Sequence, residues 1–144
     1  MGLDQAPVGI AFSRDILHCH PYLQDRWPHL RDLFQGTTGH DLILTCTWRS
    51  VEEQQRLYAQ GRTAPGKVVT WVDGIKKKSN HNFYPARAFD VAVDIDPDVQ
   101  KVVVSWDDPL YLPLIELCQI LGLVSGGSWK RADLPHVEAP FGLL

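Results

Sequence analysis

The chain has 144 residues, of which 44% are hydrophobic and 22% charged, and its formal net charge is −3. This composition is typical of a folded globular protein, and the length suits one domain with a core of its own. The slightly acidic balance argues against a dedicated nucleic-acid binder, and no apolar run is long enough to cross a bilayer. We therefore predict a single domain over residues 1–144, with an irregular lead-in over 1–14.

The first half of the chain predicts a helical region, a strand and a second helix. Apolar residues recur at helical spacing over 15–35, but Pro21 and Pro28 interrupt them, so we expect a short helical piece and then a helix beginning near Pro28. Residues 42–47 are apolar and β-branched, which is typical of a central strand. A capping box over Ser50–Glu53 begins the next helix, which Gly61 ends.

The second half begins with a long loop over 62–80 and continues with a strand over 88–95. Alternation in that strand places Phe89, Val91, Val93 and Ile95 toward the core and Asp90 on the opposite face. Residues 102–104 are expected to extend or pair with this sheet. A helix is expected from Asp108 to Gly122, and a short strand over 134–139. The whole chain is predicted to be one small α+β domain.

The thiols and the N-terminus indicate a protein folded in a cytoplasm. Cys19, Cys46 and Cys118 are odd in number and widely spaced, so we expect reduced and mostly buried thiols. The first residues lack a basic segment followed by an apolar core, so we expect no signal peptide.

His81 and Asp90 are the first candidates for chemistry. Asp90 lies on the strand face opposite the core, and the loop before it contains Pro85 and has enough slack to bring His81 back to it. The alternative for His81 is an ordinary solvated or capping histidine. Asp94 shares the face of Asp90 but lies about 13 Å further along the strand, too far for both to bind one metal ion.

A second group of candidates lies near the C-terminus. Pro135 favours an extended conformation at the residue before it, which sets Asp133 back along the chain from His136. His136 and Glu138 share a strand face, so Glu138 could orient a histidine. The alternative is a surface strand with ordinary charged residues. Two imidazoles and one carboxylate can hold zinc with a fourth position left for water, and a spare carboxylate can serve as general base.

These motifs resemble a known family. Ser79-x-His81, Ala88-x-Asp90 and Asp133-x-Pro-His136-x-Glu138 are similar to motifs of the zinc peptidases that include D-Ala-D-Ala carboxypeptidases, D-Ala-D-Ala dipeptidases and phage L-alanyl-D-glutamate endopeptidases (endolysins). The segment Thr47–Thr63 and the glycine–tryptophan turn over 126–130 also resemble that family. The resemblance runs from about Leu42 to Glu138 and keeps the family's order.

The resemblance implies a hedgehog-like, DD-peptidase-like α+β fold with an antiparallel sheet that carries one zinc ion. It implies zinc ligation by His81, Asp90 and His136, with Asp133 as general base and Arg49 facing the substrate. Further residues in the matched segments are expected to contact substrate or support the site: Ser79, Glu138, Gln55 and Trp129. The loop between His81 and Asp90 is longer than the more common spacing in the family, and Ser125 and Ser128 replace a tryptophan and an aspartate that relatives often show.

The function expected from the resemblance is cleavage of the L-Ala–D-Glu bond in peptidoglycan stem peptides by a phage endolysin. An aspartate as base is the form associated with the phage enzymes. We expect a monomer without a separate cell-wall-binding domain that is made in the host cytoplasm and acts on the wall after release. A D-Ala-D-Ala carboxypeptidase or dipeptidase is the close alternative, and a non-catalytic zinc-binding module is the alternative from another class. The run Lys76–Lys78 is either a solvated loop or an attractor of stem-peptide carboxylates.

Overall fold

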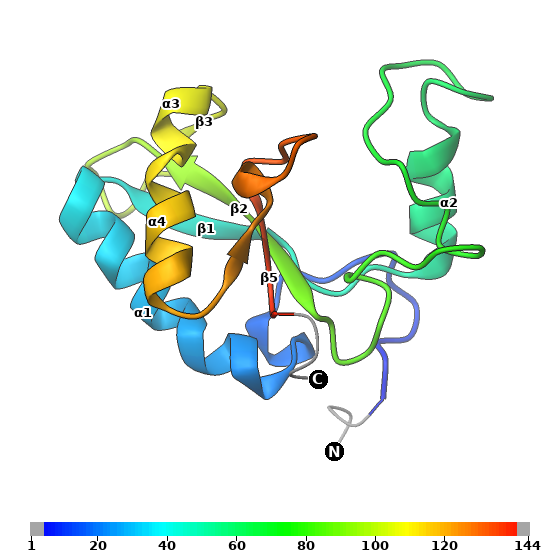
Figure 1. Cartoon of the computed structure of the whole chain (residues 1–144), viewed down its shortest axis with the longest axis horizontal. Coiled ribbons are helices and arrows are strands. Elements are labelled where there is room, and N and C mark those ends of the chain that lie inside the picture. The colour runs from blue at the N-terminus through cyan, green and yellow to red at the C-terminus, as the bar shows by residue number, and fades with distance from the viewer. Residues whose placement is uncertain (1–4, 141–144) are drawn as a thin grey trace.

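A computed structural model describes residues 5–140 of the chain, in which two helices pack on one face of an antiparallel sheet (Figure 1). The strands are β1 Asp41–Cys46, β2 Ala88–Asp94, β3 Val104–Ser105, β4 Val124–Ser125 and β5 His136–Glu138. Their order is β1-β2-β5-β4, and β3 also pairs with β2. The expected α+β fold with an antiparallel sheet is confirmed.

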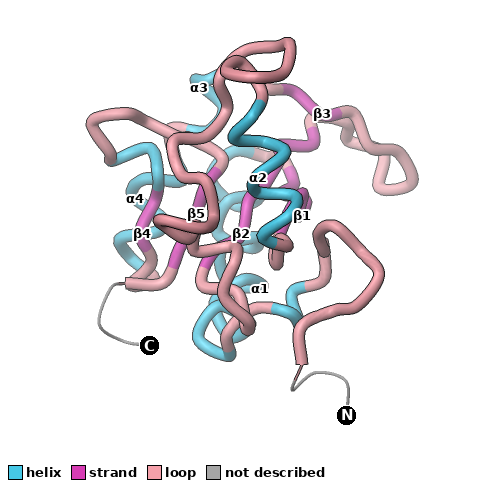
Figure 2. Tube along the Cα trace, turned by 90° about the vertical axis from the view of Figure 1, so that its right-hand side faces the viewer, coloured by secondary structure: helices cyan, strands magenta, loops and turns pink. Residues whose placement is uncertain are grey.

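Along the chain, helices stand before, between and after the strands (Figure 2). They are α1 Pro21–Thr38, α2 Val51–Ala59, α3 Asp108–Tyr111 and α4 Pro113–Ile120, with 3₁₀ turns η2 Ile16–His18 and η3 Gly126–Ser128. The helices α1 and α4 pack on the core face, whereas α2 and the loop that follows it lie apart from them (Figure 1).

The core forms where α1 and α4 cover β2. Phe89, Val91 and Val93 are fully buried, as the alternation along β2 predicts, and the edge of the Phe89 ring packs against Trp27 of α1 at 5.4 Å between ring centroids. Ile95, which was expected to join them, is 38% exposed because β2 ends one residue earlier. The other face of β2 carries two buried alanines and the carboxylates of Asp90 and Asp94.

The expected start of the first long helix was wrong. Helix α1 begins at Pro21, where a proline fits the first turn, and it continues through Pro28. A proline inside a helix costs about 3 kcal/mol. Here Pro28 is exposed, and burial of Leu23, Leu30 and Phe34 on the opposite face outweighs that cost. Gly39 ends the helix with φ 77°, near the predicted stop.

The helix α2 begins as the capping box predicts. The Ser50 hydroxyl accepts a hydrogen bond from the Glu53 amide at 3.0 Å. Gly61 follows the helix with φ 81°, and a Cβ at this position would come within 2.6 Å of the Val68 amide nitrogen. Only glycine therefore allows the long loop to turn back against its own start.

The helix expected from Asp108 to Gly122 is divided in two. The first helix, α3, ends at Tyr111, and after Leu112 the second helix, α4, begins at Pro113. The buried Tyr111 at the end of α3 donates its hydroxyl to the Ser105 carbonyl and accepts from the Val93 amide. This single hydroxyl therefore joins α3 to β2 and β3.

The three cysteines are buried free thiols, as the sequence predicts. No helix within residues 5–140 combines the length and apolar character that a membrane span requires. Of the expected lead-in over 1–14, residues 5–14 contain no helix, and Phe12 makes an isolated β-bridge with Arg49. Residues 1–4 lie outside the described part of the chain.

A bidentate ion pair connects α1 to the sheet, and it predicts that the free energy of unfolding depends on pH. The guanidinium of Arg31 donates to both carboxylate oxygens of Asp41 at 2.7 Å, and this contact lowers the pKa of Asp41 below its ordinary 3.8. A depressed carboxyl pKa contributes stability above the unfolded-state pKa, and the contribution is lost as the pH falls through the lower folded-state value.

We therefore expect Asp41→Asn to lower the free energy of unfolding by about 0.5–1 kcal/mol at pH 7, an amount typical of partly exposed pairs. The deficit should shrink as the pH falls below 3.8, as followed by urea unfolding at several pH values. The control is Asp25→Asn, because the Asp25 side chain is 72% exposed and its contact with Arg26 is longer, at 3.6 Å. A deficit for Asp41→Asn that does not change with pH would contradict the role given to the ion pair.

Candidate metal centre

The register of the sheet brings three chemically active side chains into one row. Asp90 of β2 is paired with Cys46 of β1 on one side and with His136 of β5 on the other. Paired residues of antiparallel strands point to the same face of the sheet. The register of β1 shifts between Leu44 and Cys46, as in a β-bulge. This shift places Cys46 rather than Thr45 opposite Asp90.

His81 reaches this row from the loop before β2. Its backbone carbonyl accepts from the Arg49 amide at 2.9 Å, and its Nδ1 lies 2.7 Å from the Thr47 carbonyl. Because a carbonyl only accepts, Nδ1 carries the hydrogen and Nε2 is left toward Asp90. Among the described residues, buried Nε2 has no hydrogen-bond partner; it lies 3.2 Å from Asp90 Oδ2 but is not aligned for a hydrogen bond.

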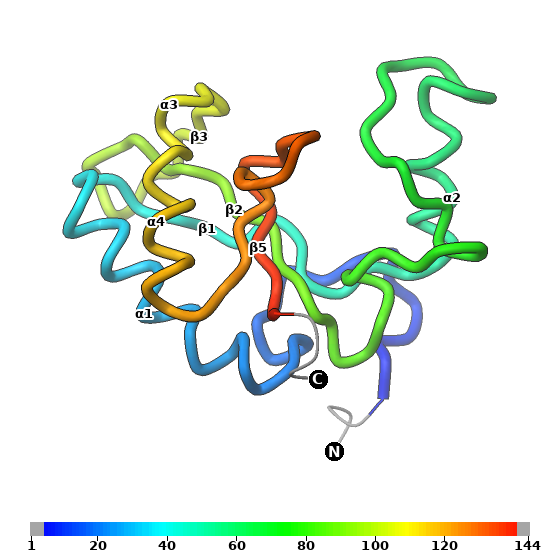
Figure 3. Tube along the Cα trace, viewed as in Figure 1, coloured from blue at the N-terminus to red at the C-terminus, as the bar shows by residue number. Residues whose placement is uncertain are grey.

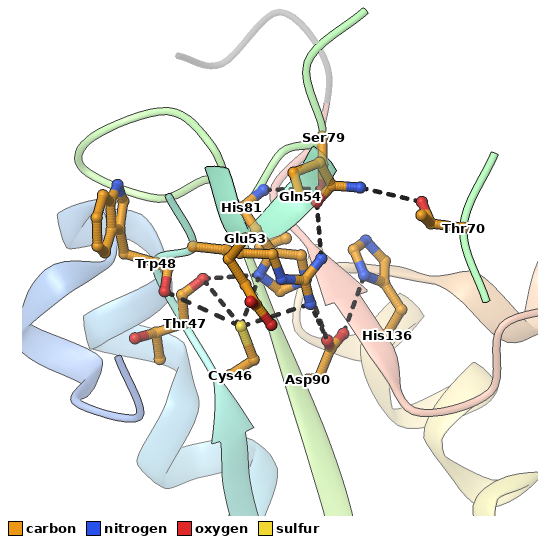
Figure 4. Close-up of polar contacts among 12 residues, drawn as sticks. Cys46, Thr47, Trp48, Glu53, Gln54, Thr70, Ser79, His81, Asp90 and His136 are labelled. Carbon is orange, nitrogen blue, oxygen red and sulfur yellow. Dashed lines mark hydrogen bonds and ion pairs between the residues drawn. The ribbon is translucent and has the colours of Figure 1, made fainter. Parts of the chain in front are cut away.

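His136 is held in a matching way by its own strand. Its Nε2 lies 2.8 Å from a carboxylate oxygen of Glu138, two residues along the same face of β5. A carboxylate on Nε2 leaves Nδ1 toward Asp90, whose Oδ1 is 3.1 Å away. Each histidine thus has one nitrogen held by the protein and the other directed at Asp90 (Figure 4).

The charges of this group reinforce one another. Burial alone would lower the pKa of His81, but the charge of Asp90 outweighs it and raises that pKa to about 10. Burial would raise the pKa of Asp90, yet the two histidines hold it well below its usual range. The pKa of His136 is raised against its burial by the carboxylates of Asp90 and Glu138. The carboxylates of Asp90 and Glu138 therefore favour the protonated form of the histidines that contact them.

The donor atoms of Cys46, His81 and Asp90 all lie within 4.8 Å of one another, so these residues form a group that could hold a metal ion. The Cys46 thiol, however, lies 3.8 Å from His81 Nδ1, the nitrogen already bonded to the Thr47 carbonyl. It also lies 3.6 Å from the Arg49 guanidinium. His136 is outside this group, but its Nδ1 is directed at Asp90 from the other side.

Arg49, which the resemblance implies to face the substrate, lies beside the group of Cys46, His81 and Asp90. Its guanidinium is 3.5 Å from Asp90 Oδ2 and donates to Gln54 Oε1 at 2.9 Å. The amide nitrogen of Gln54 then donates to the Thr70 hydroxyl and the Val72 carbonyl of the long loop. Gln54 is completely buried and connects Arg49 to that loop (Figure 4).

The structure places Gln55, which was expected to contact the site, on the exposed face of α2. The neighbouring Gln54 occupies the inward position instead. A sequence signal for this exists, because Gln54 lies three residues after Val51 and three before Leu57, on the face that these apolar residues define.

Asp133, Trp129 and Ser79 lie around the group. Asp133 stays accessible to solvent, but burial of part of its carboxyl raises its pKa, and the charge of Asp90 adds to the increase. The centroid of the Trp129 ring lies 5.0 Å from the centroid of the His136 ring. The Ser79 hydroxyl accepts from the His81 amide at 3.2 Å, so it shapes the turn that carries His81.

The turn before β5 is tightly built. A Cβ at Gly126 would collide with the Asp133 carbonyl and come within 3.0 Å of His136 Cβ. The Gly126 carbonyl accepts from the Asp133 amide at 2.9 Å. Glycine at this position therefore lets the turn place Asp133 close to His136. The lysine run Lys76–Lys78 is exposed, and Lys78 contacts the Phe83 ring.

The fold belongs to a class that is represented among solved structures. It is similar to the crystal structure of the L-Ala D-Glu endopeptidase ChiX from Serratia marcescens, with a TM-score of 0.57 over 88% of this chain and 84% of that one. The sequence identity is 19%, so this likeness shows the fold.

A curated relative adds sequence similarity. The chain is 34% identical over 110 residues to the peptidoglycan L-alanyl-D-glutamate endopeptidase CwlK from Bacillus subtilis. The aligned region covers 69% of this chain, and the chain spans 61% of the relative's length. No family model matches the chain. The family resemblance carried by the motifs is therefore supported by both sequence and fold: the chain is similar to peptidoglycan L-alanyl-D-glutamate endopeptidases.

The buried position of Gln54 leads to a prediction about the long loop. Gln54→Leu keeps the volume of the side chain but leaves the partners of three hydrogen bonds unsatisfied, so we expect a loss of roughly 2–3 kcal/mol in unfolding free energy. Trypsin should also cut faster at Lys76–Lys78 in the variant. The matched control is Gln55→Leu, which changes an exposed neighbour and should stay within about 0.5 kcal/mol of the parent. Equal effects of the two substitutions would show that Gln54 does not anchor the loop.

Proposed function

We propose that the protein is a zinc-dependent peptidoglycan endopeptidase that cleaves the L-Ala–D-Glu bond of stem peptides. The observation that carries this is Asp90 between two histidines whose other nitrogens are held by Thr47 and Glu138. The similarity to two endopeptidases named for this bond supports the substrate class.

We assign the metal ligands to His81 Nε2, Asp90 and His136 Nδ1. Two ligands of one tetrahedral zinc ion lie about 3.3 Å apart when each bond is 2.0–2.1 Å. The histidine nitrogens lie 3.2 and 3.1 Å from the Asp90 oxygens, which fits that separation. Hydrogen bonds to the second nitrogen of each histidine are the usual support of metal ligands. Cys46 is the less suitable donor because it lies on the Nδ1 side of His81 and contacts Arg49.

The remaining residues provide acid–base chemistry and charge stabilisation. Bound zinc would polarise the scissile carbonyl and lower the pKa of a water molecule. Asp133 would take the proton from the attacking water and deliver it to the leaving amine, and its raised pKa suits a general base. Arg49, held by Gln54, would oppose the negative charge that develops on the carbonyl oxygen. Glu138 would keep His136 oriented throughout.

In the cell, we assign the protein the role of an endolysin that attacks the wall after release from a host cytoplasm. The aspartate in the position of the base supports this assignment, because that form resembles the phage members of the family.

The experiment that tests the activity is mass spectrometry of purified Gram-negative peptidoglycan digested by the zinc-loaded protein, with a chelated control. Stem peptides that begin at D-Glu, with L-Ala left on the glycan, are the expected product. Loss of only a terminal D-Ala would identify a carboxypeptidase instead. A full complement of zinc without any cleavage would identify a non-catalytic zinc-binding module.

Separate substitutions should distinguish the base from the ligands. Asp133→Ala should reduce turnover by at least about 100-fold, the lower limit for a general base, with zinc still bound. His81→Ala and His136→Ala should lose zinc as well as activity, as measured by metal analysis after dialysis. Loss of zinc from Asp133→Ala would refute the assignment of Asp133 as base, since a ligand and not a base would then have been removed.

A further inference from the structure

Arg131 contacts a loop that lies far away in sequence. It belongs to the turn between η3 and β5, and its guanidinium carbon lies 3.7 Å from the centre of the Trp71 ring. Trp71 belongs to the loop after α2, which rises from the same side of the sheet as the turn (Figure 3). The contact therefore joins two segments that flank the metal centre.

Both residues are linked to the metal centre by short chains of contacts. Thr70, next to Trp71, binds Gln54, and Gln54 binds Arg49. On the other side, Trp129 lies two residues before Arg131, and its ring packs against His136. Asp133, the proposed base, lies two residues after Arg131. Arg131 thus lies in the same turn as Trp129 and Asp133, and its contact with Trp71 connects that turn to the loop that holds Gln54.

The hydrogen-bond donors of Arg131 are not used within residues 5–140. Its one recorded contact in that part of the chain is the cation–π contact with Trp71. Arg31 and Arg56, by comparison, each bind a carboxylate through two nitrogens, and Arg62 donates to two backbone carbonyls. A cation–π contact at an exposed site contributes only about 0.5–1 kcal/mol. It orients the guanidinium and leaves its five N–H donors available to a ligand.

The chemistry of the substrate supplies a matching group. The D-glutamate of a stem peptide is joined to the next residue through its side-chain carboxyl, so its α-carboxylate is free and adjacent to the L-Ala–D-Glu bond. A planar guanidinium binds a carboxylate through two parallel hydrogen bonds. Replacement of the carboxylate by its amide removes the charge and one acceptor oxygen and changes little else.

We infer that Arg131, oriented by Trp71, binds the free α-carboxylate of the D-glutamate and makes the enzyme prefer glutamate to its α-amide, isoglutamine. This inference rests on the proposed function. Arg131 is a specificity-determining residue in this account. Trp71 is a positioning residue, because it acts through the arginine.

The test compares two N-acylated peptides, L-Ala-γ-D-Glu-L-Lys and the same peptide with D-isoglutamine, with cleavage followed by liquid chromatography and mass spectrometry. Arg131→Gln should lose roughly 10- to 100-fold in kcat/KM on the glutamate peptide, the range expected for a charge-assisted hydrogen bond. On the isoglutamine peptide it should lose less than about 3-fold, because the interaction that is removed has no charged partner there.

Two further variants sharpen the result. Lys130→Gln removes an exposed positive charge from the neighbouring position and should keep the preference of the parent protein. Trp71→Ala should reduce the preference in the same direction as Arg131→Gln, with the loss confined to the glutamate peptide. Melting temperature and zinc content are measured for each variant, and neither should account for the change in preference.

The outcomes separate this inference from the function on which it rests. A parent protein that cleaves both peptides equally, or an Arg131→Gln variant that slows both by the same factor, would overturn the role of Arg131 and leave the endopeptidase in place. A zinc-loaded parent that cleaves neither these peptides nor peptidoglycan would overturn the proposed function, and the inference with it.

Discussion

The candidate site depends on the position of one carboxylate in the sheet. Asp90 is flanked by Cys46 and His136 through strand pairing, and His81 is added from the loop that precedes the strand. Strand pairing gives these side chains little freedom, because neighbouring strands fix both their separation and their direction. The register shift in β1 is part of the same constraint, since it decides which residue stands opposite Asp90. The backbone of the sheet therefore fixes the geometry of this candidate site.

Parts of the fold could be predicted from the sequence where neighbouring residues decide the structure. The alternation of β2 predicted which face would be buried, and the capping box predicted the start of α2. Motifs of known order brought His81, Asp90 and His136 forward together. The alternation and the capping box are local, so a few neighbouring residues are enough to determine them, whereas the three site residues were grouped by the resemblance to a known family.

Other features depended on contacts that no local pattern contains. Pro28 was expected to begin a helix, yet packing of the apolar face carries α1 through it. Pairing of residues 102–104 with the sheet was expected, and Val104 of β3 does pair with β2. The two-residue strand β4 has too few residues to show alternation, and it forms because β5 offers it a partner. The apolar face of α2 indicates that Gln54 points inward, but its partners Thr70 and Val72 belong to a loop without a recognisable pattern. Tertiary partners decided each of these cases.

The division of β2 into a core face and a site face has a consequence for how such a protein can change over time. Odd-numbered positions from Phe89 to Val93 maintain the packing, and Asp90 on the other face belongs to the candidate site. Substitutions on one face can accumulate with little effect on the other, so substrate preference and thermal stability can evolve almost separately. Insertion or deletion of a single residue within the strand would exchange the two faces and destroy both properties together. Changes in length are therefore expected to be confined to the segments that connect the strands and helices.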